Sequence, residues 1–478
     1  MNIVVTGIVI FYLLCMLGVG YYSSTQVKTN ADFMVAGRRL GPIFVAGSLA
    51  ATQIGGGSSL GVSEMAYGRW GMGAAWYVIA MAVTFFLLAF LGPKLRGALV
   101  KTVPEYFRRR YGEASGIVTA VIMILPLIGL TAIQIIASSV ILSVMTGLSY
   151  TYSVLAVSVV VTLYSVLGGL WAVAYTDVIQ MFLIILGSAA AIPFALSSIG
   201  GWSNVVSTLP AAQFSMTSGI SWPVIIGLII MYTTSFAVGQ ESVARYYAAK
   251  DDKSAFWGSM GASLANMLYA FIPTVLGIIT LALVTNNLID ASAIMEHGAR
   301  YALPTLAIQT MPSVIVGLLF AGIISATMSS ADSNLLGAGS IFGNDIYKVY
   351  LNKKASDTEV LKVTRIGMII IAILSTIVAL GNTRAIITVL MFAFTLRAGG
   401  AFIPYVVGHY WKKASAAGAL ASIIVGSVAV ILVERGTISF FGLNAIYPGI
   451  FFSLLVFLPA CYIWPNKKDS TELEEEAA

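Results

Sequence analysis

Residues 51–59 read Ala-Thr-Gln-Ile-Gly-Gly-Gly-Ser-Ser and lie inside an otherwise apolar stretch, 42–66, that is long enough to cross a bilayer. Consecutive glycines hold a helix poorly. Unwound backbone at membrane depth is tolerated only where protein buries it or a cavity adjoins it, because lipid cannot satisfy its N–H and C=O groups. The stretch therefore predicts a broken helix whose carbonyls can coordinate a cation and whose half-helix ends can face a solute. Close helix packing through small residues is the alternative interpretation.

The composition indicates a membrane protein. Of 478 residues, 58% are hydrophobic and 10% are charged, with a mean hydropathy of +0.91, whereas soluble domains carry about a quarter charged residues. The net charge of +6 comes without a basic cluster interleaved with aromatics, so we expect no nucleic-acid partner. The lipid bilayer and a small-molecule substrate remain as expected partners.

Apolar runs between charged or turn-rich breaks predict an all-α polytopic protein of about thirteen transmembrane helices. The expected spans cover residues 3–22, 42–66, 70–93, 115–144, 151–168, 174–197, 222–239, 256–284, 307–341, 363–381, 385–410, 416–433 and 448–464. The first run lacks a basic leading segment and a small-residue cleavage site, so we expect a retained helix rather than a signal peptide. The acidic end, 471–478, is expected to be disordered.

The distribution of Lys and Arg predicts the topology, because cationic loops accumulate on the cytoplasmic side. With the N-terminus outside, the cytoplasmic connections hold 21 of the 26 basic residues, Arg245 among them. Four more lie in outside loops, and Arg397 falls within a span. We therefore expect an integral protein of the plasma membrane (the bacterial inner membrane) with an outside N-terminus and a cytoplasmic C-terminus.

A second interruption occurs in the seventh span, where residues 232–240 read Tyr-Thr-Thr-Ser-Phe-Ala-Val-Gly-Gln. Two interrupted helices at matching positions of two halves are expected of an inverted repeat with a binding site between them. The expected transport core, 41–412, divides into a first repeat at 41–197 and a second at 222–412. Residues 1–40 supply a peripheral helix and a cytoplasmic loop, and 413–478 supply two peripheral helices and the acidic tail.

The densest polar cluster inside a span is 325–334, Ser-Ala-Thr-Met-Ser-Ser-Ala-Asp-Ser-Asn. On a helix, spacings of three and four residues place these side chains on adjacent faces: Ala326, Ser329, Ser330 and Ser333. The result is an oxygen-rich surface of the kind that hard cations prefer. Hydroxyls that bond back to their own helix are the alternative interpretation.

Ionisable groups inside a membrane are costly and are often functional. Asp332 lies within the ninth span, and Asp177 lies near the cytoplasmic start of the sixth, where capping that helix is an equal alternative. Glu64 and Glu241 lie close enough to span ends to be solvated. Arg397 could pair with a carboxylate or extend to the membrane interface. The last three therefore stay ambiguous.

The sequence offers little support for catalytic or transition-metal chemistry. Cys15 and Cys461 lie far apart in apolar helices, and the only histidines are His297 and His409. Without a His-rich cluster or a nucleophile paired with a base, we expect no enzyme activity and no catalytic residues.

Several motifs together resemble the sodium:solute symporter family. They are Asp32-Phe33 with Ala36-Gly37-Arg38, Gly168-Gly169, Thr176-Asp177 with Gln180, Ser329-Ser330, Gly400 to Pro404 with Gly408, and Trp411-Lys412-Lys413 with Gly418-Ala419. The resemblance runs through nearly the whole chain and implies an inverted five-helix-repeat core of the kind seen in the bacterial leucine transporter. Residues 328–333 and the glycine break look most like the family's choline transporter branch.

The resemblance implies Na+ as the coupling ion. The family's main sodium site uses carbonyls of the broken helix with carbonyl and hydroxyl oxygens of the ninth span, and it carries over to Ala51, Ile54, Ala326, Ser329 and Ser330. A second sodium site, present in some members, carries over to Asp177, Asp332 and Ser333. Asp332 replaces the serine of members with a well-described second site, which implies tighter ion binding or a proton in place of the ion.

The choline substrate does not carry over. A quaternary ammonium needs an aromatic cage, whereas Gln53 stands where the choline branch places a tryptophan, and no tryptophan lies at or beside Gly239. Position near the broken helices selects the candidate substrate-binding residues: Gln53, Ser58, Ser59, Trp76, Tyr77, Gln134, Tyr232, Ser235 and Phe236. The aromatic members are equally consistent with packing. An amide and small neutral groups favour an amino acid or a monocarboxylate.

We therefore expect a sodium-coupled symporter that imports a small polar organic solute by alternating access. Sodium bound between the two repeats should favour the outward-open state and complete the pocket, because a ligand shifts a conformational equilibrium only by its differential affinity for the states. Proton coupling through Asp332 is the nearest alternative. A channel or a sensor is more remote, because a channel needs a continuous polar lining and a sensor an output domain.

Overall fold

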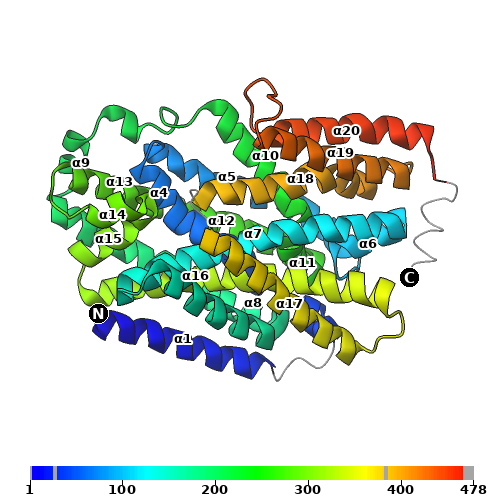
Figure 1. The fold of residues 1–478 in the computed structure, drawn as a ribbon, viewed down its shortest axis with the longest axis horizontal. Helices are drawn as coiled ribbons and strands as arrows, with labels where there is room; N and C mark the ends of the chain where they lie inside the picture. The colour runs from blue at the N-terminus through cyan, green and yellow to red at the C-terminus, as the bar shows by residue number, and fades with distance from the viewer. Residues whose placement is uncertain (1–2, 25–29, 382–385, 467–478) are drawn as a thin grey trace.

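The computed structural model describes residues 3–24, 30–381 and 386–466, and these residues form an all-helical bundle (Figure 1). Within them, the only pairing of strand type is an isolated bridge between Leu40 and Ala249. The α-helices are α1 (Ile3–Ser24), α2 (Asn30–Val35), α3 (Pro42–Gln53), α4 (Val62–Tyr67), α5 (Trp76–Gly97), α6 (Val103–Tyr111), α7 (Glu113–Thr146), α8 (Tyr150–Ile199), α9 (Trp202–Thr208), α10 (Trp222–Val238), α11 (Gln240–Ala248), α12 (Asp252–Tyr269), α13 (Phe271–Thr285), α14 (Ser292–His297), α15 (Ala302–Thr310), α16 (Ser313–Ser340), α17 (Asp357–Gly381), α18 (Ile386–Tyr410), α19 (Ala416–Glu434) and α20 (Ile446–Ile463). The short tight or wide helical turns are η1 (Ala36–Arg38), η2 (Gly57–Gly61), η3 (Gly71–Ala75), η4 (Ala211–Phe214), η5 (Ala299–Tyr301) and η6 (Ile341–Leu351).

Up to ten of the thirteen expected spans are long and apolar enough to cross a membrane in the described residues, and the other three are shorter or interrupted helices. Within the described residues, nine helices are long and apolar enough to cross a membrane, and α10 with α11, bent by 55°, makes a tenth. Two shorter apolar helices lie at Ile3–Met16 and Tyr150–Val166. With the interrupted pair α3 and α4, these segments match the thirteen expected spans one to one.

The limits of the ninth span were predicted wrongly. The expected segment, 307–341, joins the end of α15 to α16, but α15 ends at Thr310 and α16 begins after Pro312. Proline suits a helix start because its φ is fixed and it has no N–H to donate within a helix. At the other end the helix continues through the wide turns of η6 to Leu351.

The surface of α17 shows how the bundle meets lipid. Isoleucines spaced by three or four residues are exposed along one face: Ile366, Ile370, Ile373 and Ile377. The opposite face, which includes Met368 and Ile371, is buried against the bundle. An apolar face left exposed on a helix of this length suits a hydrocarbon solvent.

α16 lies at the centre of the bundle and is the most buried span, with 83% of its most apolar window inside the protein. It packs against α8, α7, α1 and α17. α1 runs along one edge of the molecule, and α19 and α20 lie along the opposite edge, beside α18 (Figure 1). The expected acidic tail, 471–478, lies outside the described residues.

α8 consists of two arms that fold back on each other at Gly169. That residue has φ 60° and ψ −172°, and the Tyr164 hydroxyl donates to the Thr176 hydroxyl at 3.1 Å. In one straight helix, twelve residues would separate these groups by about 18 Å. A Cβ at position 169 would lie 2.5 Å from the Phe33 ring. Both the backbone and the close approach therefore require glycine, and the arms correspond to the fifth and sixth expected spans.

Candidate functional site

The predicted break between α3 and α4 is present. α3 ends at Gln53, and Ile54 leaves the helical region with φ −79° and ψ 81°. The Ser58 hydroxyl accepts a hydrogen bond from Gly55 N at 2.9 Å and donates to Gln53 O at 3.1 Å, so it replaces two of the missing helical bonds. The close-packing interpretation also holds in part, because a Cβ at Gly56 would collide with Ala137.

The second predicted break separates α10 from α11 at Gly239, whose φ −69° and ψ 119° are extended. A Cβ at position 239 would lie between 2.6 and 2.8 Å from three atoms of the Arg397 guanidinium. Glycine is therefore needed here for the approach of α18 rather than for its φ. The 55° bend turns α11 back into the bundle.

Three neutral oxygens converge where α16 passes the first break. The Ser330 hydroxyl donates to Ala326 O at 3.1 Å and lies 3.4 Å from Ala51 O. All three residues are buried, and so is Ile54 at the break itself. Neutral hydroxyl and carbonyl oxygens suit a hard monovalent cation that must be released in each cycle. The alternative interpretation, in which hydroxyls bond back to their own helix, also holds, because the Ser330 hydroxyl donates to the Ala326 carbonyl of α16.

Ser329, predicted to belong with Ser330, is directed elsewhere. Its hydroxyl donates to one oxygen of the Asp177 carboxylate, while the Ser48 hydroxyl donates to the other at 2.5 Å. Asp177 is fully buried and lies eight residues beyond Gly169, well inside the second arm of α8. The capping interpretation of Asp177 was therefore wrong, because a capping side chain sits at the first turn.

Arg245 was wrongly predicted to lie in a cytoplasmic loop. It is 1% exposed on α11, with its Nη2 3.6 Å from Asp177 Oδ2. Its Nη2 donates to the Ser333 hydroxyl at 2.5 Å, and its Nε donates to the Ser48 hydroxyl at 3.0 Å. The bend at Gly239 carries this arginine inward. A guanidinium thus lies among residues predicted to hold a second sodium ion.

Asp332, the third of those residues, faces the first arm of α8. Ser165 donates a hydrogen bond to its carboxylate. Asp332 is 2% exposed, and within the described part of the chain it forms no ion pair at bonding distance. Asp177 and Asp332 are therefore held by different elements, although both lie near Arg245 in the buried centre.

A small cavity adjoins the two breaks. It has a volume of about 20 Å³, little more than one water molecule needs. Four predicted substrate residues line it, namely Gln53, Ser58, Tyr77 and Gln134. The other lining residues are Thr52, Gly55, Gly57, Met81, Leu130, Glu241, Asn334, Leu390 and Phe394. The Gln134 amide oxygen accepts from Gly56 N at 2.8 Å, which ties α7 to the break.

The other five predicted substrate residues do not line this cavity. The Ser59 hydroxyl contacts the Tyr269 hydroxyl at 2.8 Å, and the Trp76 indole donates to Met216 O at 3.1 Å. Tyr232 and Phe236 pack with other aromatic rings behind the cavity, at centroid distances of 5.1 to 5.5 Å. Packing is therefore the observed role of these aromatics in this state. Ser235 accepts a hydrogen bond from Arg397 at 2.6 Å.

A buried ion pair forms part of the cavity wall. Arg397 binds Glu241 with two hydrogen bonds, of 2.7 and 2.6 Å, and each side chain is 1% exposed. Glu241, which the sequence left ambiguous, is therefore buried, and of the two alternatives for Arg397 the pairing with a carboxylate is confirmed. Arg397 lies inside the predicted span 385–410, which was the available signal for it, whereas Glu241 lies two residues beyond the predicted span 222–239. Leu130, Leu390 and Met81 carried no such signal, because apolar residues fill every span.

Two broken helices that meet buried hydroxyl and carbonyl oxygens and a small polar cavity are the arrangement expected of an ion-coupled membrane transporter. A sequence profile of the sodium:solute symporter family matches residues 33–426, and the chain belongs to this family. Sodium is therefore the coupling ion, and the protein is a transporter rather than an enzyme.

Relatives in the family transport different solutes. The chain is 26% identical to the sodium/pantothenate symporter of Haemophilus influenzae, with 100% of both chains covered. It is 25% identical to the osmoregulated proline transporter of Bacillus subtilis, over 93% of this chain and 92% of that one. A high-affinity choline transporter of Drosophila melanogaster is 29% identical, over 79% and 62%. The expected likeness to the choline branch is thus present, but it is not the most extensive one.

The fold also agrees with a solved structure. A Na+-coupled sialic acid symporter in a substrate-bound outward-open state superposes with a TM-score of 0.82 at 22% identity, covering 98% of this chain and 100% of that one. The predicted all-α inverted-repeat core, of the leucine-transporter kind, is confirmed.

Proposed function

We propose that this symporter imports a small zwitterionic amino acid, whose ammonium group faces Glu241 and whose carboxylate faces Tyr77 and the start of the half-helix 57–67. The observation that carries the proposal is the buried Glu241 carboxylate in the cavity wall. The breaks of α3 and α10, on either side of this cavity, supply the flexible joints that alternating access requires.

Charge distinguishes an amino acid from a monocarboxylate, the other class favoured by the sequence. Glu241 is the only acidic or basic residue in the cavity lining, since its partner Arg397 lies behind it. An ammonium group can donate to the lone pairs that Arg397 leaves free on the Glu241 oxygens, whereas the carboxylate of a substrate has no proton to donate to them. The similar proline transporter handles a substrate of the same class.

Another part of the cavity lining suits a carboxylate. The Tyr77 hydroxyl is buried and makes no hydrogen bond of standard geometry among the described residues, although the Tyr232 ring lies beside its own ring at 5.4 Å between centroids. A Cβ at Gly57 would lie 3.0 Å from that hydroxyl, so the ring tip touches the start of the half-helix. The positive end of a helix dipole and an unused hydroxyl are both favourable to a negative group. Gln53 and Gln134 supply amide groups to the same lining.

We assign the main sodium site to the carbonyls of Ala51, Ile54 and Ala326 and the hydroxyl of Ser330. In the predicted second site, the Arg245 guanidinium already supplies a cation beside Asp177 and Ser333. Adding a second sodium ion there would place like charges within a few ångströms in a buried site. We therefore propose one sodium ion per substrate.

The orientation and domain division carry over as proposals. An outside N-terminus and a cytoplasmic C-terminus in the bacterial inner membrane remain favoured by the basic residues left after Arg245 is removed from the loop count, 20 of 26. The repeats, 41–197 and 222–412, each contain one broken helix near their start, α3 with α4 and α10 with α11. Their rocking about the site would expose it to each side in turn.

Uptake into proteoliposomes tests the proposal. The substrate panel pairs each amino acid with the same carboxylic acid lacking its amino group, in sodium and in potassium. We expect sodium-dependent uptake of an amino acid but not of its des-amino partner, and loss of this selectivity in Glu241→Gln. Glu64→Gln, a substituted acid away from the cavity, is the control. Equal uptake of the des-amino acid would overturn the proposal. A sodium Hill coefficient near one would support single-ion coupling.

A further inference from the structure

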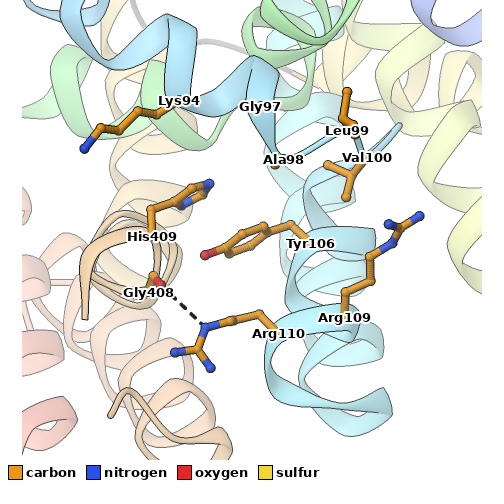
Figure 2. Close-up of a pocket in the computed structure, with 10 residues that line it drawn as sticks. All are labelled: Lys94, Gly97, Ala98, Leu99, Val100, Tyr106, Arg109, Arg110, Gly408 and His409. Atoms are coloured by element: carbon orange, nitrogen blue, oxygen red, sulfur yellow. Dashed lines mark hydrogen bonds between the residues drawn. The ribbon is translucent and has the colours of Figure 1, made fainter. Parts of the chain in front are cut away.

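A second and much larger cavity opens between the ends of α5, α6 and α18. Its volume is about 520 Å³. Figure 2 shows Tyr106 and His409 meeting in its middle, with Lys94 on one side and Arg110 on the other. The two rings stack in parallel with centroids 4.2 Å apart. None of the lining residues belongs to the cavity between the broken helices, so this is a separate site.

The charges around this cavity are one-sided. Lys94, Arg109 and Arg110 line it, together with His409, and no acidic residue does. Arg109 is paired with Glu105 at 2.7 Å. For Lys94 and Arg110, no carboxylate lies at ion-pair distance within the described residues. At least two positive charges are therefore left without a counter-ion.

Arg110 is the most unusual of these groups because it is only 2% exposed. Its Nη2 donates to the carbonyls of Trp411 and Lys412, at 3.2 and 3.1 Å, so it holds the end of α18. Its Nη1 is buried without a hydrogen-bond partner. A buried guanidinium with an unused donor and no paired carboxylate is costly unless an anion completes it.

The aromatic residues beside the cavity indicate that it lies near the membrane interface. The Lys94 amine sits 3.8 Å from the centre of the Tyr410 ring, at the last residue of α18. The next residue, Trp411, packs against Tyr462 near the end of α20 at 5.7 Å. Tyrosine and tryptophan gather at membrane interfaces, and basic pockets between helices at this level suit phosphate groups.

We propose that this cavity binds a phosphate-bearing anion, which bridges Lys94 on α5, Arg109 and Arg110 on α6, and the end of α18. The same chemistry is offered by the headgroup of an anionic phospholipid and by a soluble phosphate. A bound phosphate would balance the unpaired positive charges of the lining and link the ends of α5, α6 and α18. It acts outside the sodium and substrate sites, so it is independent of the proposed substrate.

Thermal unfolding of the purified full chain in uncharged detergent tests this. One series adds phosphatidylglycerol or phosphatidylcholine at equal mole fraction, and a second adds inorganic phosphate or pyrophosphate against chloride at matched ionic strength. The variants are Lys94→Gln and Arg109→Gln, with Lys413→Gln as a control of equal charge outside the lining. Arg110 is left intact because it also holds α18. Each lining charge removed should weaken binding about fivefold.

Stabilisation by phosphatidylglycerol but not by the soluble phosphates, weakened in Lys94→Gln and Arg109→Gln and kept in the Lys413→Gln control, would identify a lipid headgroup. Stabilisation by the soluble phosphates with the same variant pattern would identify a soluble anion. The proposal fails if no phosphate compound stabilises the protein, or if the Lys413→Gln control weakens binding as much as the lining variants.

Discussion

Replacing Arg397 by glutamine should destabilise the protein far more than the loss of a surface charge would. The substitution removes two hydrogen bonds to Glu241 and one to Ser235, all between 2.6 and 2.7 Å, and leaves a carboxylate that is 1% exposed without its counter-charge. Breaking a buried pair from one side costs about 3–5 kcal/mol. For 478 residues, an unfolding entropy of about 2 cal/mol/K per residue makes this a fall in melting temperature of about 3–5 °C.

The matching double variant separates charge imbalance from lost packing. Arg397→Gln with Glu241→Gln removes both charges and leaves two amides that can hydrogen-bond, so it should be more stable than either single variant. The exposed pair Lys353 and Glu113, at 73% and 66% exposure, provides the control. Lys353→Gln should change stability by less than about 1 kcal/mol. Melting of all variants in one detergent is the assay. Additive losses in the double variant would refute the reasoning, because they would mean that the two charges do not interact.

Three other substitutions test the site and its supports. Ser330→Ala should weaken sodium binding about 10- to 100-fold, because it removes one of the oxygens that contact the charged ion. The sodium-dependent change in fluorescence measures this, and Ser422→Ala, remote from the site, is the control. Gly55→Ala would put a Cβ 2.5 Å from the Ser330 hydroxyl, so it should abolish the sodium response, whereas Gly41→Ala, with nothing within 4 Å, should not. Gly169→Ala should lower stability by about 1–3 kcal/mol, because φ 60° and ψ −172° are unfavourable with a side chain; an unchanged melting temperature would contradict the hairpin at this residue.

Short stretches of sequence were enough to predict most of the fold. The break at 51–59 follows from glycines that cannot sustain a helix and from hydroxyls that can replace its hydrogen bonds, as Ser58 does. The thirteen spans follow from hydropathy, since lipid imposes the same length on each helix. The limits of α16 did not follow, because the hydropathy of 307–312 continues across Pro312 while the backbone does not.

The polar centre was less predictable, because it depends on where a bent helix points. Arg245 reads as a loop residue because it lies beyond the expected end of the seventh span at residue 239 and between the polar stretches 240–242 and 250–253. Only the 55° bend directs it to Asp177 and Ser333. Similarly, Glu241 and Arg397 lie 156 residues apart, and nothing in either local sequence indicates the other as its partner. Pairing across the bundle is a property of packing rather than of composition.

The geometry of Gly55 indicates how sodium and substrate could be coupled. A Cβ at this position would lie 2.5 Å from the Ser330 hydroxyl on one side and 2.7 Å from the Gln134 amide oxygen on the other. The first contact belongs to the proposed sodium site and the second to the cavity wall. A sodium ion that binds the carbonyls of the break would therefore fix the position of this backbone. Gln134 contacts the same backbone, so the cavity wall that holds the substrate would be fixed as well. Coupling of this kind is reciprocal, so the substrate should raise sodium affinity by the same factor as sodium raises substrate affinity.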